Sequence, residues 1–271
     1  MTRVYVEGVG LWGPGLEGWR ASRPVLAGRA DYVASPAAAP QPALLPPNER
    51  RRAVETVKLA LAAGAEALAE AGRDPSATAT VLTSSGGDGG TIDQIMTVLA
   101  SPERALSPTR FHNSVHNAPS GYWGIATGAR APSTSLCCHD GSFAAGLLEA
   151  AVQAVSEDRA VALIAYDVRY PSPLSLVRPI GAAFAVALVL SPAPGHASFA
   201  RIDVRLEANA VLTAVSPAAL ETLRRNTPAA RALPMLAAFA RREAGSVTLD
   251  YLDDLALTLD LAPVHPAGPR R

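Results

Sequence analysis

The sequence predicts a layered α/β fold, in which helices cover both faces of a sheet rich in parallel strands. Between residues 3 and 206, apolar segments of strand length alternate with segments of helix length. This alternation is typical of strand–helix–strand units. The chain of 271 residues is 49% hydrophobic and 5% aromatic, with abundant alanine. That composition fits a helix-rich globular protein with one large core or two smaller ones.

The first half of the chain contains two predicted strands and two predicted helices. Residues 3–9 form the first strand, and 12–47 is an irregular segment rich in proline and glycine. Asn48 is a suitable N-cap for a helix over 49–71, and Gly72 can end it in the left-handed conformation. The second strand, 78–83, leads into a glycine-rich turn at 84–90. Thr91 and Gln94 then form a capping-box pattern for a helix that ends near Ala100.

The second half follows the same alternation before its composition changes. A short helix at 119–127 precedes a strand at 132–136, and a helix of small residues spans 141–155. Three further strands are predicted at 160–165, 181–190 and 199–206. Beyond residue 210 the chain is rich in alanine, leucine and arginine, which favours helices. The alternating pattern of 246–261 indicates one or two final strands.

Charge and cysteine content exclude several classes of protein. The 24 basic and 24 acidic residues cancel, so the strongly basic surface of a nucleic-acid-binding protein is absent. No segment has the length of a membrane span or the pattern of a signal peptide. The two cysteines are neighbours, and adjacent strand residues point to opposite faces, so they are poorly placed to form a disulfide. We therefore expect a cytoplasmic protein.

Cys138 is the candidate catalytic residue. It stands where the strand 132–136 runs directly into the helix at 141, and the start of a helix favours a reactive thiolate. We expect Cys137 to point into the sheet and Cys138 to be the more reactive thiol. The alternative is that Cys138 is a small buried apolar residue. The consecutive residues His139 and Asp140 cannot complete a catalytic triad with it, because triad members come from separate elements.

Other patterns resemble the sequence motifs of cofactor or metal sites but lack a residue or an element that such sites require. Gly8, Gly10 and Gly13 spell a dinucleotide fingerprint with Asp31 downstream, but Pro14-Gly15 makes the required helix improbable. The glycine run 84–90 lacks the lysine of a phosphate-binding loop. His112 and His116 have no third ligand in reach. We expect no cofactor and no metal.

The order of these motifs resembles the N-terminal half of the β-ketoacyl synthases. Gly146 stands eight residues after Cys138, as in that family, and the 84–90 turn has a counterpart. Arg178-Pro179 with Gly181, and His196-Ala197 with Arg201, also match family segments. The resemblance implies a thiolase-like layered fold, with Cys138 at the acyl-accepting position. It divides the chain into a ketosynthase-like half, 1–206, and a divergent C-terminal segment, 207–271, that packs on the same domain. The chain is thus truncated relative to full ketosynthases.

Departures from the family pattern decide the expected function. Ketosynthases use two histidines from their second half, whereas only His139, His196 and His265 follow Cys138 here. None begins a His-Gly-Thr motif, and Gly195-His196 comes too early. The resemblance therefore implies a non-condensing partner, similar to the chain length factors of aryl polyene pathways. It would form a heterodimer with a full-length β-ketoacyl synthase through 118–140, including Tyr122 and Trp123, and acyl carrier protein would be a transient partner. The alternatives are a free-standing acyltransferase that uses Cys138 and a homodimeric scaffold.

Overall fold

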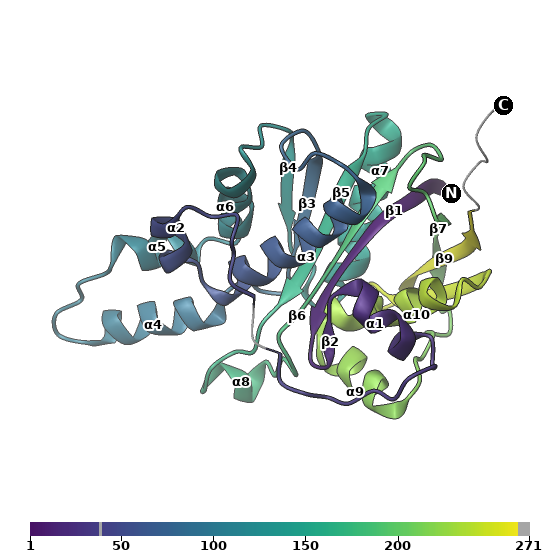
Figure 1. The fold of residues 1–271 in the computed structure, drawn as a ribbon. Helices are drawn as coiled ribbons and strands as arrows, with labels where there is room; N and C mark the ends of the chain where they lie inside the picture. Colours follow the sequence, from purple (N-terminus) through teal and green to yellow (C-terminus); the bar gives the residue numbers. More distant parts are fainter. Residues whose placement is uncertain (38–39, 265–271) are drawn as a thin grey trace.

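A single mixed sheet organises the protein, which is described here by a computed structural model over residues 1–37 and 40–264. The strands lie in the order β4-β3-β5-β6-β1-β7-β9-β8, and the short β2 pairs with β1 (Figure 1). Their bounds are β1 Thr2–Gly13, β2 Leu16–Glu17, β3 Ala79–Thr83, β4 Ser133–Leu136, β5 Val161–Asp167, β6 Phe184–Ser191, β7 Ala200–Ala208, β8 Gly245–Asp250 and β9 Leu255–Pro263.

The expectation of a sheet rich in parallel strands is wrong. Among the residues that the structure describes, the pairs β3–β4 and β3–β5 are parallel, and the other strand pairs are antiparallel. The chain passes from β5 to β6 through a loop that holds only the one-turn helix α8 (Leu174–Val177). Without a crossover helix, β6 returns in the opposite direction. The connection between β8 and β9, residues 251–254, is a short turn.

Helices cover both faces of the sheet, as predicted (Figure 1). On one face, α3 (Glu55–Ala71) and α6 (Ala118–Thr127) bury a core against the alternate side chains of β5 and β6. On the other face, α7 (Ser142–Ser156), the 3-10 helix η2 (Pro228–Ala232) and α10 (Leu233–Arg241) bury a second core. Because β5 and β6 are buried on both sides, they appear in the sequence as continuous apolar runs.

The glycines of the dinucleotide-like pattern serve packing. A Cβ at Gly8 would lie 2.1 Å from the Ala67 carbonyl oxygen, and one at Gly10 would lie 1.9 Å from that of Ala63. Both contacts are with the backbone of α3, which therefore crosses β1 at a distance that only glycine permits. No helix begins at Gly13, where β1 ends, so the helix N-terminus that a pyrophosphate needs is missing at this position.

Several helices differ from the predicted ones. The helix predicted over 49–71 is two helices, α2 (Pro47–Arg52) and α3, because the backbone is extended at Ala53 and Val54. Asn48 therefore lies inside α2 and caps nothing, whereas Gly72 ends α3 in the left-handed conformation as predicted. The cap of α4 (Gly89–Ala100) is Asp88, whose carboxylate accepts the Thr91 N–H, so the predicted capping box is also wrong. The sequence did not predict α1 (Trp19–Leu26), which lies inside the segment expected to be irregular, or the short helices α5 (Pro108–Ser114) and α8. It predicted helices beyond residue 210 without bounds, and one of them is α9 (Ala218–Asn226).

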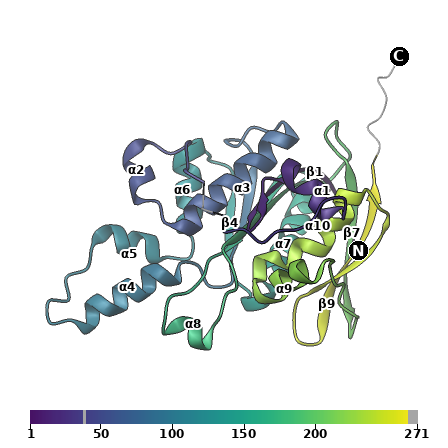
Figure 2. The same cartoon turned by 60° about the horizontal axis from the view of Figure 1, so that its bottom comes forward.

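The C-terminal segment completes the same sheet. β7 runs across residue 206, and β9 and β8 extend the sheet beyond it. Figure 2 shows α9, α10 and β9 gathered at one end of the molecule, opposite α4 and α5. In the described parts of the chain, no helix combines the length and the apolar character needed to cross a membrane.

Candidate functional site

The turn between β4 and α7 carries both cysteines. The strand ends at Leu136, and a 3-10 turn, η1 (His139–Gly141), separates Cys138 from the first residue of α7. Ser142 closes this turn, because its hydroxyl accepts the Cys138 N–H at 2.9 Å and donates to the His139 carbonyl at 2.7 Å. Gly141 has no space for a side chain, since a Cβ would lie 2.2 Å from the Tyr251 carbonyl oxygen.

The strained residue of the turn is His139. Its φ is +46°, a left-handed conformation that non-glycine residues seldom adopt, whereas Cys138 has a φ of −141°. In enzymes with a strand-to-helix nucleophile turn, the strain falls on the nucleophile itself. Here it falls on an exposed imidazole that lies 3.8 Å from Asp140. The backbone at Cys138 therefore lacks the positive φ of such a nucleophile.

The two thiols are arranged differently from the prediction. Cys137 is exposed, and its thiol donates a hydrogen bond to the Ser85 carbonyl at 3.1 Å. The expectation that Cys137 points into the sheet is therefore wrong, because the chain has left the strand before residue 137. Cys138 is partly exposed. The greater reactivity expected of Cys138 stays a prediction.

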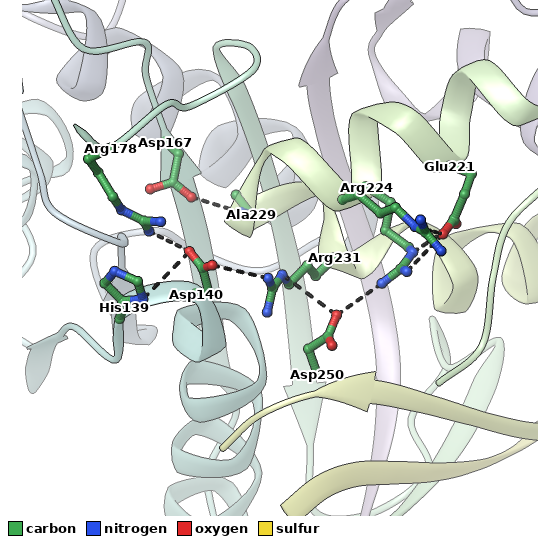
Figure 3. Close-up of polar contacts among 10 residues, drawn as sticks. His139, Asp140, Asp167, Arg178, Glu221, Arg224, Ala229, Arg231 and Asp250 are labelled. Carbon is green, nitrogen blue, oxygen red and sulfur yellow. Dashed lines mark hydrogen bonds and ion pairs between the residues drawn. The ribbon is translucent and has the colours of Figure 1, made fainter. Parts of the chain in front are cut away.

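Asp140 follows the cysteines and is held by two arginines (Figure 3). Its carboxylate accepts hydrogen bonds from Arg178 and, at 3.3 Å, from Arg231. Burial opposes ionisation of this carboxyl, but the Arg178 hydrogen bond and the charges of Arg231 and Arg178 outweigh it and lower the pKa of Asp140. A carboxylate so paired is a poor base. Asp140 therefore holds the turn through its two arginine partners.

The ion pairs continue from this turn into the C-terminal segment. Arg231 lies 3.6 Å from Asp250 at the end of β8, and Arg224 lies 3.0 Å from the same carboxylate oxygen. Arg224 also donates two hydrogen bonds of 2.8 Å to Glu221, and these lower the pKa of Glu221 to about 2 (Figure 3). Residues 221–250 thus support the cysteine turn through alternating charges.

Asp167 is the most buried acid at this end of the sheet. It accepts the backbone N–H groups of Ser85 and Ala229, each at 2.8 Å, and the hydroxyl of Ser84 at 3.2 Å. Burial raises the pKa of Asp167 to about 6, against the effect of these hydrogen bonds. We did not predict this residue. Its sequence signal was an acid at the end of a fully apolar strand, where a buried carboxylate requires partners from distant segments.

Comparison with known proteins identifies the family. Residues 26–249 match the family model described as β-ketoacyl synthase, N-terminal domain. The chain belongs to this family. The match continues across residue 206, so it includes most of the segment that we described as divergent. No protein with a curated description matches the chain.

Solved structures share the ketosynthase fold over their full length. A chain of the complex of the ketosynthase ApeO with its chain length factor ApeC, from Xenorhabdus doucetiae, has a TM-score of 0.73 and 21% identity. The alignment covers 96% of this chain and 99% of that chain. The ishigamide ketosynthase/chain length factor has a TM-score of 0.72 and 13% identity, and the alignment covers 98% of this chain and 100% of that chain. A chain from the structure of a type II PKS acyl-carrier protein in complex with its ketosynthase has a TM-score of 0.73 and 14% identity. That alignment covers 97% of this chain and 99% of that chain. At these identities the similarity shows the fold, which is the predicted thiolase-like one.

Of the histidines that the structure describes, His196 lies far from the thiols, whereas His139 adjoins Cys138 and His116 contacts the carbonyl of Ser84, next to the Ser85 carbonyl that accepts from Cys137. His196 is exposed in the turn between β6 and β7. Residues at that end of β6 pair with Tyr5 and Val161, at the beginnings of β1 and β5, whereas Cys138 follows the end of β4. The two residues therefore lie at opposite ends of the sheet. His265 is outside the described residues.

The remaining candidate residues do not form a metal site. Among residues 1–37 and 40–264, no three histidine, cysteine or acidic side chains are grouped so that they could hold a metal ion. The His112 ring packs edge-on against Tyr122, and His116 Nε2 lies 3.3 Å from the Ser84 carbonyl oxygen. Asp31 is exposed after α1.

The aromatic residues predicted at a partner contact belong to the core. Tyr122 and Trp123 are buried between α6, α3 and the sheet, and the Tyr122 hydroxyl donates to Asn113 at 3.0 Å. The expectation that they meet a partner is wrong, because the apolar face of α6 turns inward. The strand β4 remains in the predicted region, and it is an edge strand.

Proposed function

We propose that this chain is a non-condensing, ketosynthase-like subunit that pairs with a full-length β-ketoacyl synthase in polyketide or fatty-acid-like chain elongation. In this role it resembles the chain length factors of aryl polyene pathways. Acyl carrier protein is the transient third component, and the complex acts in the cytoplasm. The observation that carries the proposal is the position of His196 at the opposite end of the sheet from Cys138.

Condensation requires hydrogen-bond donors at the developing negative charge of the thioester. Loss of one such donor typically costs an enzyme about 2.7–4 kcal/mol of transition-state stabilisation. Near the cysteine turn, the cationic donors Arg178 and Arg231 are both paired with Asp140. His139 carries a side chain directed to solvent. Arg178 and Arg231 thus hold their positive charge in ion pairs with Asp140, and His116, which contacts the Ser84 carbonyl, is a further candidate donor near Cys137.

Pairing with another subunit is supported by the free side of β4. Within residues 1–37 and 40–264, β4 pairs with β3 on one side and with no strand on the other. Open edges of sheets are sites for pairing with another chain. Three of the similar solved structures are, by their descriptions, complexes that contain a ketosynthase.

The test is reconstitution with a full-length β-ketoacyl synthase from the same organism. We expect that the chain alone forms no β-ketoacyl product from acyl and malonyl carrier thioesters, and that the purified pair does. Cys137→Ser and Cys138→Ser variants should leave the product rate of the pair within about threefold of wild type, because the partner supplies the nucleophile. Product formation by the chain alone, or failure of the two proteins to copurify, would contradict the proposal.

An acyltransferase that uses Cys138 is the second candidate, supported by two accessible thiols at a strand-to-helix turn. In that case a carrier thioester would acylate the protein, and Cys138→Ser alone would abolish the mass increase in intact mass spectrometry. The homodimeric scaffold, the third candidate, would give a stable dimer by light scattering and no binding to the ketosynthase.

A further inference from the structure

The helix α4 exposes an apolar stripe to solvent. Ile92, Met96 and Leu99 are 36%, 59% and 41% exposed, and their spacing places them on one side of the helix. The buried residues Thr91 and Ile95 lie beside the stripe and hold the helix to the body, so the stripe is the exposed continuation of the buried side. Single exposed apolar residues are common, but an aligned set on one helix indicates a contact surface.

The stripe belongs to a helical arm that extends from the body. The arm comprises α4 and α5, residues 89–114, and both views show it projecting past α2 and α6 (Figures 1 and 2). Phe111 on α5 is 64% exposed. Asn113 anchors the arm, because its amide donates to the Arg52 carbonyl at 2.9 Å and its oxygen accepts from Tyr122. The arm is therefore attached firmly at its base while its apolar side remains uncovered.

The arm is continuous with the open edge of the sheet. α5 packs on α6, and α6 packs on β4, where the hydroxyls of Ser120 and Ser133 lie 2.8 Å apart. A four-residue edge strand offers little contact area by itself. A stable protein complex buries roughly 800 Å² on each partner, so pairing at β4 requires additional surface on the same flank.

We propose that the α4–α5 arm is the second element of the ketosynthase-binding surface and that its Ile92–Met96–Leu99 stripe packs on an apolar groove of that partner. This inference rests on the proposed function. A subunit that adds its own strand to β4 must occupy the space beyond the edge, which is the side toward which the arm extends. The stripe contains no charged residue, so its complement is apolar. Methionine at its centre adapts to the shape of the opposing surface.

The test compares two pairs of substitutions on the same helix. In the first variant, Met96→Asp and Leu99→Asp are combined, so that charge enters the stripe at exposed positions. In the control variant, Gln94→Asp and Thr97→Asp are combined, because both residues are exposed and lie off the stripe. Affinity for the full-length β-ketoacyl synthase that copurifies with wild type is measured by titration calorimetry, and thermal unfolding of each variant is recorded.

We expect the stripe variant to bind the ketosynthase at least 30-fold more weakly and the control to stay within threefold of wild type. Equal affinities of the stripe variant and wild type overturn the inference. If a charged substitution at the β4 edge still weakens binding in that case, the proposed function stands without the arm. If wild type does not bind the ketosynthase, both proposals fail. Self-association that only the stripe variant abolishes would assign the arm to a second copy of the chain and would overturn the ketosynthase as its occupant.

Discussion

The two edge strands of the sheet differ in whether their outward backbone groups are hydrogen-bonded. At the β8 edge, the preceding segment of the chain covers the strand: the Thr213 N–H donates to the Thr248 carbonyl, and the Thr248 N–H donates to the Thr213 hydroxyl, both at 2.9 Å. At the β4 edge, the described residues make no corresponding backbone hydrogen bond. The Pro132 and Leu136 carbonyls accept from β3, so by alternation the backbone groups of Ser133 and Ser135 face the open side.

This difference indicates which edge is available to another chain. Proteins protect exposed strand edges because unpaired backbone groups promote aggregation. The chain protects β8 with its own residues and anchors it with the Asp250 ion pairs, whereas β4 stays free beside the apolar arm. We therefore expect substitutions at β4 to weaken partner binding and substitutions at β8 to affect stability alone.

The largest effect is expected from Ser135→Pro. Proline removes the outward N–H of β4, while the hydrogen bonds to β3 come from neighbouring positions. We expect the affinity for the ketosynthase to fall at least 100-fold in titration calorimetry. Ser246→Pro is the matched control, because alternation from Thr248 directs its N–H away from β9 at the other edge. Equal loss of affinity in both variants would contradict the assignment of β4.

Removal of the Asp250 carboxylate should destabilise the β8 end. The nearly buried Arg224 and Arg231 share this acid, and both lose a partner in Asp250→Ala. We expect the free energy of unfolding to fall by about 2 kcal/mol in urea denaturation. Asp260→Ala, which removes an exposed ion pair with Arg205, should cost less than about 0.5 kcal/mol. The ketosynthase affinity of both variants should match that of wild type.

Asp167 joins the turn after β3 to the C-terminal segment, because it accepts from Ser85 and Ala229. Its titration should change the free energy of unfolding with pH. Its folded pKa of about 6 exceeds the ordinary value of 3.8, so the folded state binds a proton more readily than the unfolded state. Its contribution therefore increases as the pH falls, by about 1.4 kcal/mol between pH 7.5 and 5.0. Glu221 has a lowered pKa and opposes this trend only below its unfolded value of 4.5. Asp167→Asn should abolish the increase, and an unchanged pH dependence in this variant would contradict the assignment.

The smallest effect is expected from Thr213→Ala. The variant loses the hydroxyl that accepts the Thr248 N–H but keeps the backbone hydrogen bond. We expect a loss of about 0.5–1 kcal/mol in unfolding free energy and no change in ketosynthase affinity. A tenfold change in that affinity would show that the β8 edge also contacts the partner.

Local sequence patterns predicted the elements that depend on neighbouring residues. Strands β3, β5 and β6 are buried on both faces, so their apolar runs are evident, and Gly72 ends α3 through its own backbone freedom. The family motifs around Cys138 predicted the thiolase-like fold. The sequence could not predict the short helix α1, since it carries a proline, Pro24, and no N-cap side chain.

By itself, the sequence determined the main strands, the family and the strand-to-helix position of the cysteines, because periodicity and motif spacing are properties of nearby residues. Only the tertiary structure decided the direction of β6, the burial of Tyr122 and Trp123 and the ion pairs of Asp140. These features depend on residues far apart in the chain: Asp140 is 91 positions from Arg231, and Asp167 is 82 positions from Ser85. Such contacts leave no local period, so their partners are identified only when the sheet brings its strand ends together.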